Sequence, residues 1–225
     1  MKNKIKIKNI NVWTYVLGVI ILAFGCSLMT KADLGISMVV APAYLIHLKI
    51  SQTYSHFTFG MAEYLLQFLL IAAMSAILGK VKKNYILSFV TALFYGFVLD
   101  VFLYFVKDVQ VYNITGRIIY YALGMVLSSL GVALFFHTTF SPCAYDYFVR
   151  EVAQSKNINI TVFKTCYDII SCIAAIAMSF VFFGFMHFEG VKWGTVICAL
   201  VNGTIIGFFG KVLEYFFDFE KQKYA

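Results

Sequence analysis

The sequence is poor in charged residues and in proline. Only 13% of its 225 residues are Asp, Glu, Lys or Arg, and it contains two prolines. Soluble domains carry roughly 25% charged residues, whereas 61% of this chain is hydrophobic and its mean hydropathy is +0.83. These values exclude an ordinary soluble domain. They indicate an integral membrane protein whose main partner is the lipid bilayer.

Several kinds of site are also missing. The five cysteines and four histidines show no CxxC pair and no metal-ligand spacing with any acid, so we expect buried free thiols, no metal and no cofactor. No phosphate-binding glycine loop or serine-nucleophile motif is present, so we do not expect an enzyme. The net charge of +7 comes from lysines and arginines in short loops and at the termini. We assign these to membrane orientation and not to nucleic-acid binding.

What the chain has in quantity is apolar segments long enough, at about 20 residues each, to cross a bilayer. Six of them lie near 12–30, 58–79, 85–106, 117–137, 161–184 and 193–216. No small-residue cleavage site follows the first, so we expect it to be retained and not removed as a signal peptide. The sequence therefore predicts an all-α polytopic protein with a single transmembrane domain over residues 1–225.

Basic residues are distributed unevenly between the two sides of these predicted spans. One side would carry Lys2, Lys4, Lys6, Lys8, Lys80, Lys82, Lys83, Arg150, Lys156, Lys221 and Lys223. The other would carry only Lys31, Lys49, Lys107, Arg117 and Lys192. Because the more basic side faces the cytoplasm, we expect both termini there.

The two halves of the chain share a sequence pattern. Tyr15–Leu28 aligns with Tyr121–Leu134 and keeps two glycines in register. With a shift one residue longer, 92–102 aligns with 199–209 and again matches a glycine. Two nearly equal shifts, found far apart in the chain, indicate a duplicated unit.

The predicted repeats cover about 9–108 and 115–217, with three spans each. Because three is an odd number, the second repeat would enter the membrane inverted, as in many secondary transporters with alternating access. Two segments, at about 37–49 and 141–154, are too polar to cross the membrane and too apolar for plain loops. We expect each to form a short helix that lies along the interface or re-enters the membrane.

Ser141 and Pro142 favour a helix start in the second of these segments. Serine caps free backbone N–H groups, and proline is tolerated at the first helical position. If this helix re-enters the membrane, its N-terminus would present N–H groups and partial positive charge to an anion or carboxylate. If it lies at the interface, it would only anchor the bundle.

Ionisable side chains at membrane depth are costly, so each needs a partner or a function. Asp168 lies one turn inside the fifth span, four residues after Lys164. The two either neutralise each other or line a substrate or proton path. Asp146, on the second short helix, would face the same vestibule if that helix dips inward. Glu63 and Asp168 fall at nearly corresponding positions of the two repeats, which would suit paired gates.

Two further polar residues lie within predicted spans. Asp100 has no basic residue within one turn, so it is either a protonation site or a buried acid bonded to a tyrosine. Asn202 either lines a polar path or forms an interhelical hydrogen bond. We interpret the spaced glycines as helix-packing positions; these are Gly18, Gly25, Gly124, Gly131, Gly203 and Gly207.

Several motifs carry a resemblance to a known family. They are ADLGIS at Ala32–Ser37, an Arg–Gly spacing at Arg117–Gly124, SPCAYDYFV at Ser141–Val149, KTCYD at Lys164–Asp168 and a glycine-rich run from Gly194. Over nearly its whole length the chain resembles the YczE/YyaS/YitT-like integral membrane proteins of bacteria. This resemblance implies a small multi-spanning membrane protein or permease of a bacterial cell membrane, and it supplies no substrate.

The leading functional hypothesis is a secondary transporter or permease for an unknown small solute, working through intramembrane carboxylates at the repeat interface. One alternative is a substrate-capture subunit of an ATP-driven importer, which would also be small, basic and without an ATP motif. The other is a membrane assembly or regulatory protein that moves no solute. A homo-oligomer is compatible with all three.

Overall fold

The computed structural model describes residues 10–138, 140–184 and 189–217, which form helices and no β-strand. Six helices are long and apolar enough to cross a membrane, as expected for a multi-pass membrane protein. These are α1 (Ile10–Ala32), α3 (Phe59–Leu78), α4 (Lys83–Val106), α5 (Ile114–Phe136), α7 (Ile160–Phe183) and α8 (Trp193–Phe216). The two short helices are α2 (Ala41–Ser51) and α6 (Ala144–Ser155). The six predicted spans are confirmed to within a few residues.

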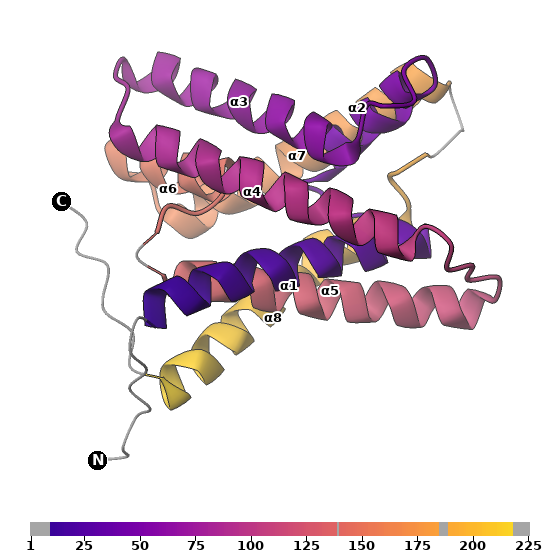
Figure 1. Ribbon diagram of the computed structural model, residues 1–225. Helices are drawn as coiled ribbons and strands as arrows, with labels where there is room; N and C mark the ends of the chain where they lie inside the picture. The colour runs from indigo at the N-terminus through magenta and orange to yellow at the C-terminus, as the bar shows by residue number, and fades with distance from the viewer. Residues whose placement is uncertain (1–9, 139, 185–188, 218–225) are drawn as a thin grey trace.

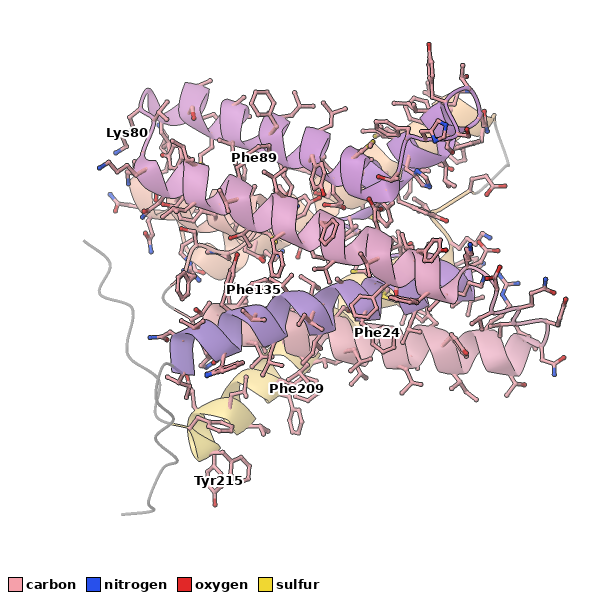
Figure 2. The ribbon with its side chains drawn as sticks, viewed as in Figure 1. Phe24, Lys80, Phe89, Phe135, Phe209 and Tyr215 are labelled. Carbon is pink, nitrogen blue, oxygen red and sulfur yellow. The ribbon has the colours of Figure 1, made fainter. Side chains whose placement is uncertain are left out.

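The helices form two groups that meet along α1 and α4 (Figure 1). In one group α1 and α5 run antiparallel and make the most extensive helix–helix contact, and α8 packs on α5. In the other group α3 packs on α4, and α2 and α6 each pack between α3 and α7. Many large apolar side chains on the long helices are exposed, as lipid-facing residues would be. Figure 2 shows Tyr215 at the outer side of α8 and Lys80 at the connection between α3 and α4.

Small residues set the distance between α1 and α5. A Cβ atom added to Gly25 would lie 2.5 Å from the backbone nitrogen of Ser128 and 2.7 Å from the Gly124 carbonyl oxygen. One added to Gly131 would lie 2.7 Å from the Cβ of Leu22. Helices in lipid gain stability from such close approach, since no hydrophobic force drives them together there. The predicted packing role of these glycines is confirmed.

Gly203 and Gly207 of α8 differ from that expectation. A Cβ atom at either position would meet nothing within 4 Å in the described part of the chain. The prediction that this GxxxG pair packs against another helix of the same chain is therefore wrong. The α8 surface that carries both glycines lines a cavity instead.

The second short helix, α6, returns through the bundle beside α3. Its first backbone N–H, at Ala144, donates to the Gln67 side chain near the middle of α3 (3.0 Å). Glu151, two turns later, pairs with Lys82 at the end where α4 begins. The helix therefore re-enters the bundle and does not lie flat at its end.

The predicted start of α6 at Ser141 is wrong by three residues. Hydroxyl groups of α4 bind the carbonyl oxygens that precede the helix, with Ser88 donating to Pro142 (2.6 Å) and Thr91 to Ser141 (2.9 Å). These bonds fix the chain in a non-helical form as far as Cys143. Serine and proline thus form the turn that enters the bundle, and the helix follows it.

The first short helix, α2, has the opposite direction and also begins later than predicted. The Ser37 carbonyl accepts hydrogen bonds from the N–H groups of Val40 and Ala41 (3.0 and 2.9 Å), which forms a turn before the helix. Near the other end of α2, Lys49 donates to the Phe182 carbonyl of α7 (3.0 Å). The chain therefore enters the bundle through a turn and leaves it along α2.

The ADLGIS motif forms a polar clamp at the end of the bundle where α5 and α8 begin. Asp33 has a left-handed backbone (φ 51°) and pairs with Arg117 (2.8 Å) and with Lys192 (2.5 Å). Arg117 also donates to the Ala32 carbonyl at the end of α1 (2.7 Å). A cation suits this position because the C-terminus of a helix carries partial negative charge. The clamp fastens α1, α5 and α8 together.

The five cysteines are free thiols. Cys26, Cys143 and Cys198 are buried, as predicted, whereas Cys166 is exposed and Cys172 half-buried. The last two lie on α7, which is one of the least covered helices within the described chain. The prediction of buried thiols is therefore right for three of the five positions.

Replacing Gly25 by alanine should lower the free energy of unfolding by about 1–3 kcal/mol, the usual cost of an overpacked contact. Its Cβ atom would collide with the backbone of α5, which has no flexible end that can give way. Replacing Gly207 by alanine is the matched control, since its Cβ atom meets open space. We expect that control to unfold at the same or a higher temperature, because alanine favours a helix over glycine. Thermal unfolding of both variants in detergent measures the difference, and equal destabilisation would contradict it.

Candidate functional site

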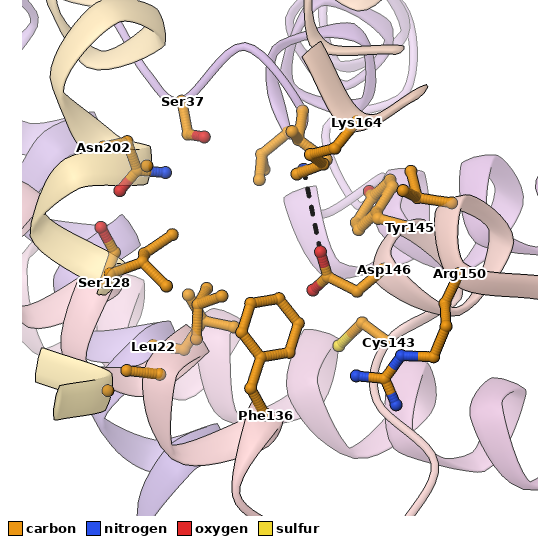
Figure 3. A pocket seen from close by; sticks show the side chains of 18 of the residues that line it. Leu22, Ser37, Ser128, Phe136, Cys143, Tyr145, Asp146, Arg150, Lys164 and Asn202 are labelled. Carbon is orange, nitrogen blue, oxygen red and sulfur yellow. Dashed lines mark ion pairs between the residues drawn. The ribbon is translucent and has the colours of Figure 1, made fainter. Parts of the chain in front are cut away.

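The structure contains a cavity of about 640 Å³ between the two groups of helices. One wall comes from α5 and α8 and the other from α6 and the start of α7 (Figure 3), and residues of α1 and α4 also line the space. Its size is within the range of small-molecule sites, about 300–1,000 Å³. Most of the lining is apolar, and it includes Leu22, Val39, Val40, Val132, Ala133, Phe136, Val149 and Ile206.

The cavity exists because α7 and α8 barely touch each other, whereas α3 and α4 pack along their length. Gly203, Gly207 and Gly210 of α8 face this space and contribute no side chain to it. One end of the cavity is bordered by His137 and Gln154, near the ends of α5 and α6. The space therefore extends from the middle of the bundle toward the end where α5, α6 and α8 finish.

A charged cluster lies on the wall formed by α6 and α7. The Lys164 ammonium is 2.8 Å from an Asp168 carboxylate oxygen and 3.8 Å from an Asp146 carboxylate oxygen. All three side chains are mostly buried. The predicted contact between Lys164 and Asp168 is confirmed, and Asp146 joins it from the re-entrant helix. One cation thus holds two carboxylates from two helices at the edge of the cavity.

Arg150 lies on the same wall, one turn beyond Asp146. Its guanidinium carbon is 5.8 Å from the centre of the Phe136 ring of α5. Such a distance allows a cation–π attraction. The polar wall therefore reaches across the cavity end toward α5 (Figure 3).

Hydrogen-bonding groups line the opposite wall. Ser129 of α5 donates to the Asn202 side-chain oxygen (2.6 Å), which joins α5 to α8. Figure 3 shows the Asn202 amide nitrogen, Ser37 and Ser128 facing the cavity from the side opposite Asp146 and Lys164. Both interpretations of Asn202 hold at once, because it forms an interhelical bond and also lines the space.

Glu63 lies behind this cavity and not in its lining. Its side chain is fully buried on α3, and one carboxylate oxygen, Oε2, accepts bonds from the Tyr145 hydroxyl and from Gln67 (3.1 Å for the latter). Tyr145 lines the cavity. Burial raises the pKa of the Tyr145 phenol well above its ordinary value, so this group stays protonated and acts as the donor. Glu63 is therefore one side chain away from the cavity.

Asp100 and Ser141 lie outside the cavity lining. Asp100 accepts a hydrogen bond from the Gly60 backbone N–H (2.8 Å) in the first turn of α3. A carboxylate is favourable there because the N-terminus of a helix carries partial positive charge. Ser141 has its carbonyl bonded to Thr91. The structure thus brings Asp146, Lys164 and Asn202 to one space, with Asp168 behind Lys164, and leaves Asp100 and Ser141 apart from it.

Sequence reasoning missed several polar residues at or behind the cavity, among them Ser37, Ser128, Gln67 and Tyr145. Gln67 had a usable signal, because a glutamine in the middle of an apolar span needs a partner. Serine and tyrosine are common in membrane helices and give no such signal. Their position depends on the re-entrant helices, which bring distant segments together.

Replacing Lys164 by methionine should destabilise the protein by about 1.5–3 kcal/mol, the range for lost hydrogen bonds to charged groups. The change leaves the Asp146 and Asp168 carboxylates next to each other without their cation. Adding Asp146→Asn and Asp168→Asn should restore part of the loss. Replacing the exposed Lys156 by methionine is the control and should change little. Thermal unfolding measures all four proteins, and a triple variant less stable than Lys164→Met would contradict this reading of the cluster.

Comparison with known proteins gives one match. A model of a family of unknown function, DUF6198, matches residues 9–211. No curated protein and no solved structure matches the chain. The matched range includes both short helices and every cavity-lining residue. The more specific resemblance to YczE/YyaS/YitT-like proteins stays a prediction, but the coarser conclusion holds, and the chain belongs to the family of unknown function DUF6198.

Proposed function

We propose that this protein is a small-solute permease and that the cavity is its solute site. The observation that supports this most strongly is the cluster of Lys164, Asp146 and Asp168 at the edge of a space of about 640 Å³. Ionisable groups inside membrane spans are expensive, and they typically mark a solute or ion path. The proposal includes no catalytic step, cofactor or metal ion.

The lining indicates the kind of solute. Most of the surface is apolar, with charges on one wall and neutral hydrogen-bonding groups on the other. Such a site fits a compact organic solute that has an apolar body and polar groups at two sides. A small inorganic ion would leave most of this apolar surface in contact with water.

An inverted repeat is the second part of the proposal, and matched helix contacts support it. If α1 to α4 correspond to α5 to α8, the contact of α1 with α4 corresponds to that of α5 with α8. The contact of α2 with α7 likewise corresponds to that of α6 with α3. The α1–α5 contact is its own counterpart and would contain the two-fold axis.

The α3–α4 contact departs from this symmetry, as does the α4–α6 contact, which has no α8–α2 counterpart in the described chain. The first of these differences fits alternating access. The counterpart of the close α3–α4 contact is the sparse α7–α8 contact, which leaves the cavity open. In the other state α7 would close on α8 while α3 and α4 part. Solute would then exchange with the opposite side.

The cavity mouth faces the cytoplasm in this proposal, and both chain ends lie on that side of a bacterial cell membrane. Lys80 lies at that end of the bundle (Figure 2), and Lys82 and Lys83 lie there at the start of α4. This supports the orientation by the positive-inside rule. The predicted terminal lysines, Lys2, Lys4, Lys6, Lys8, Lys221 and Lys223, lie outside the described residues.

Native mass spectrometry of the full chain, extracted gently from its own membrane, tests the function. We expect the protein alone or as a homo-oligomer, with a small organic molecule bound. The Asn202→Ala variant should lose that molecule, because it removes the amide that faces the cavity. The Lys156→Met control should keep it, since Lys156 is exposed and is not among the lining residues.

Two results would overturn the proposal. A pair of co-purifying ATPase subunits would make the chain the capture subunit of an ATP-driven importer. A stable protein partner without any small molecule would favour an assembly or regulatory role. Equal retention of the molecule by the Asn202→Ala variant would place the solute site elsewhere in the protein.

A further inference from the structure

We propose that Glu63 is a proton-binding site, which carries a proton in this structure and exchanges it with the cavity through Tyr145. The proton-binding site stands on the geometry alone. Its role as the coupling site of a permease rests on the function proposed above, and it would make the proton the coupling ion.

Glu63 lacks a compensating charge among the described residues. Glu63 is fully buried, and the described part of the chain forms no ion pair with it. Its Oε2 atom accepts two hydrogen bonds, but Oε1 has no hydrogen-bond partner among the described residues. A charged carboxylate without a cation is very costly in such surroundings, whereas a protonated carboxyl group is tolerated.

Among the described residues, the groups around Glu63 offer protons but no positive charge. They come from α1, α4, α6 with its preceding turn, and α7. The titratable groups among them are Cys26, Tyr95, Cys143, Tyr145 and Tyr167. Thiols and phenols are neutral when protonated and cannot offset a carboxylate charge. The neutral acid is therefore the form that this environment favours.

Glu63 also has a short route to the cavity. Four of these five groups, Cys26, Tyr95, Cys143 and Tyr145, also line the cavity. Tyr145 is the direct link, since its hydroxyl is bonded to Glu63 Oε2. When Glu63 is loaded, Tyr145 passes its hydroxyl proton to Oε2 as it takes a proton from water in the cavity. The carboxyl group then flips, which leaves the proton on Oε1 and lets Oε2 accept from Tyr145 and Gln67 again. The phenol is neutral before and after, and release reverses both transfers.

Glu63 is also linked mechanically to the proposed solute site. Glu63 and Gln67 bind the first two residues of α6, through the Tyr145 hydroxyl and the Ala144 backbone N–H. The same helix carries Asp146 into the charged cluster at the cavity. Loss of the proton would place a charge at the start of α6 and change these bonds. Proton binding and solute binding are thereby coupled through one short helix.

Infrared spectroscopy of the full chain in a maltoside detergent, which has no ester carbonyl groups, tests the proton. We expect the wild type minus Glu63→Gln difference spectrum to contain the carbonyl stretching band of a protonated carboxyl group. This band should fade as the pH is raised. In Tyr145→Phe it should remain but shift in frequency, because the bond to Oε2 is lost.

A second measurement uses only wild-type protein, so its result does not depend on whether Glu63→Gln folds. Wild-type protein grown with carboxyl-labelled glutamate should show the same band at an isotope-shifted frequency. The other described glutamates are suited to be charged, since Glu151 is ion-paired and Glu189 and Glu214 are exposed. Absence of a protonated glutamate band at every pH where the protein is folded would overturn the inference.

The coupling is tested with the co-purified molecule in native mass spectrometry at two pH values. Retention by the wild type should fall several-fold at the higher pH, whereas Glu63→Gln, which mimics the protonated acid, should retain it at both. If the infrared band of protonated Glu63 is present but no small molecule co-purifies, the proton-binding site is supported and the permease function is overturned. If a small molecule co-purifies but the infrared band is absent, the permease function is supported and proton coupling is overturned. The same conclusion follows if retention of the molecule by the wild type does not depend on pH.

Discussion

The close contact between α1 and α5 is the constraint on which the other parts of the structure depend. Backbone atoms of the two helices approach so closely that a single added Cβ atom at Gly25 or Gly124 would overlap the opposite helix. Because lipid provides no hydrophobic force between helices, this dense packing has to come from small residues. With α1 and α5 fixed in this way, α4 packs on α1 and α8 packs on α5, and the short helices fill the remaining space.

The polar interior follows from the re-entrant helices. Each brings unbonded backbone groups into the bundle, and side chains of neighbouring helices satisfy them, as Gln67 does at Ala144 and Ser88 at Pro142. In lipid such groups have no water to bind, so the bundle must contain these partners. This need explains Gln67, Ser88 and Thr91 within the spans. This need does not explain Glu63 or the cluster around Lys164, because side chains that do not ionise could bond the same backbone groups.

The sequence was sufficient to predict the elements that follow from local composition. Span positions follow from apolar length, the glycine contact follows from matching intervals, and Lys164 meets Asp168 because both lie on one helix face. Features that depend on distant segments were not predictable. The start of α6 was misjudged because Ser141 is held by Thr91 of another helix, and the glycines at 203 and 207 face a cavity because α7 stands away from α8.

The first turn of α8 is tied to the chain that leads into α2. The Gly194 N–H donates to the Leu34 carbonyl (2.9 Å), and the Thr195 hydroxyl accepts from the Ile36 N–H (3.1 Å). Ser37, the next residue along, belongs to the cavity wall. The two bonds therefore tie the first turn of α8, the least buried of the six long helices in the described chain, to the Ser37 turn on the same side of the cavity. A displacement of α8 would pull on this turn and on α2, which follows it, so α8 cannot move alone.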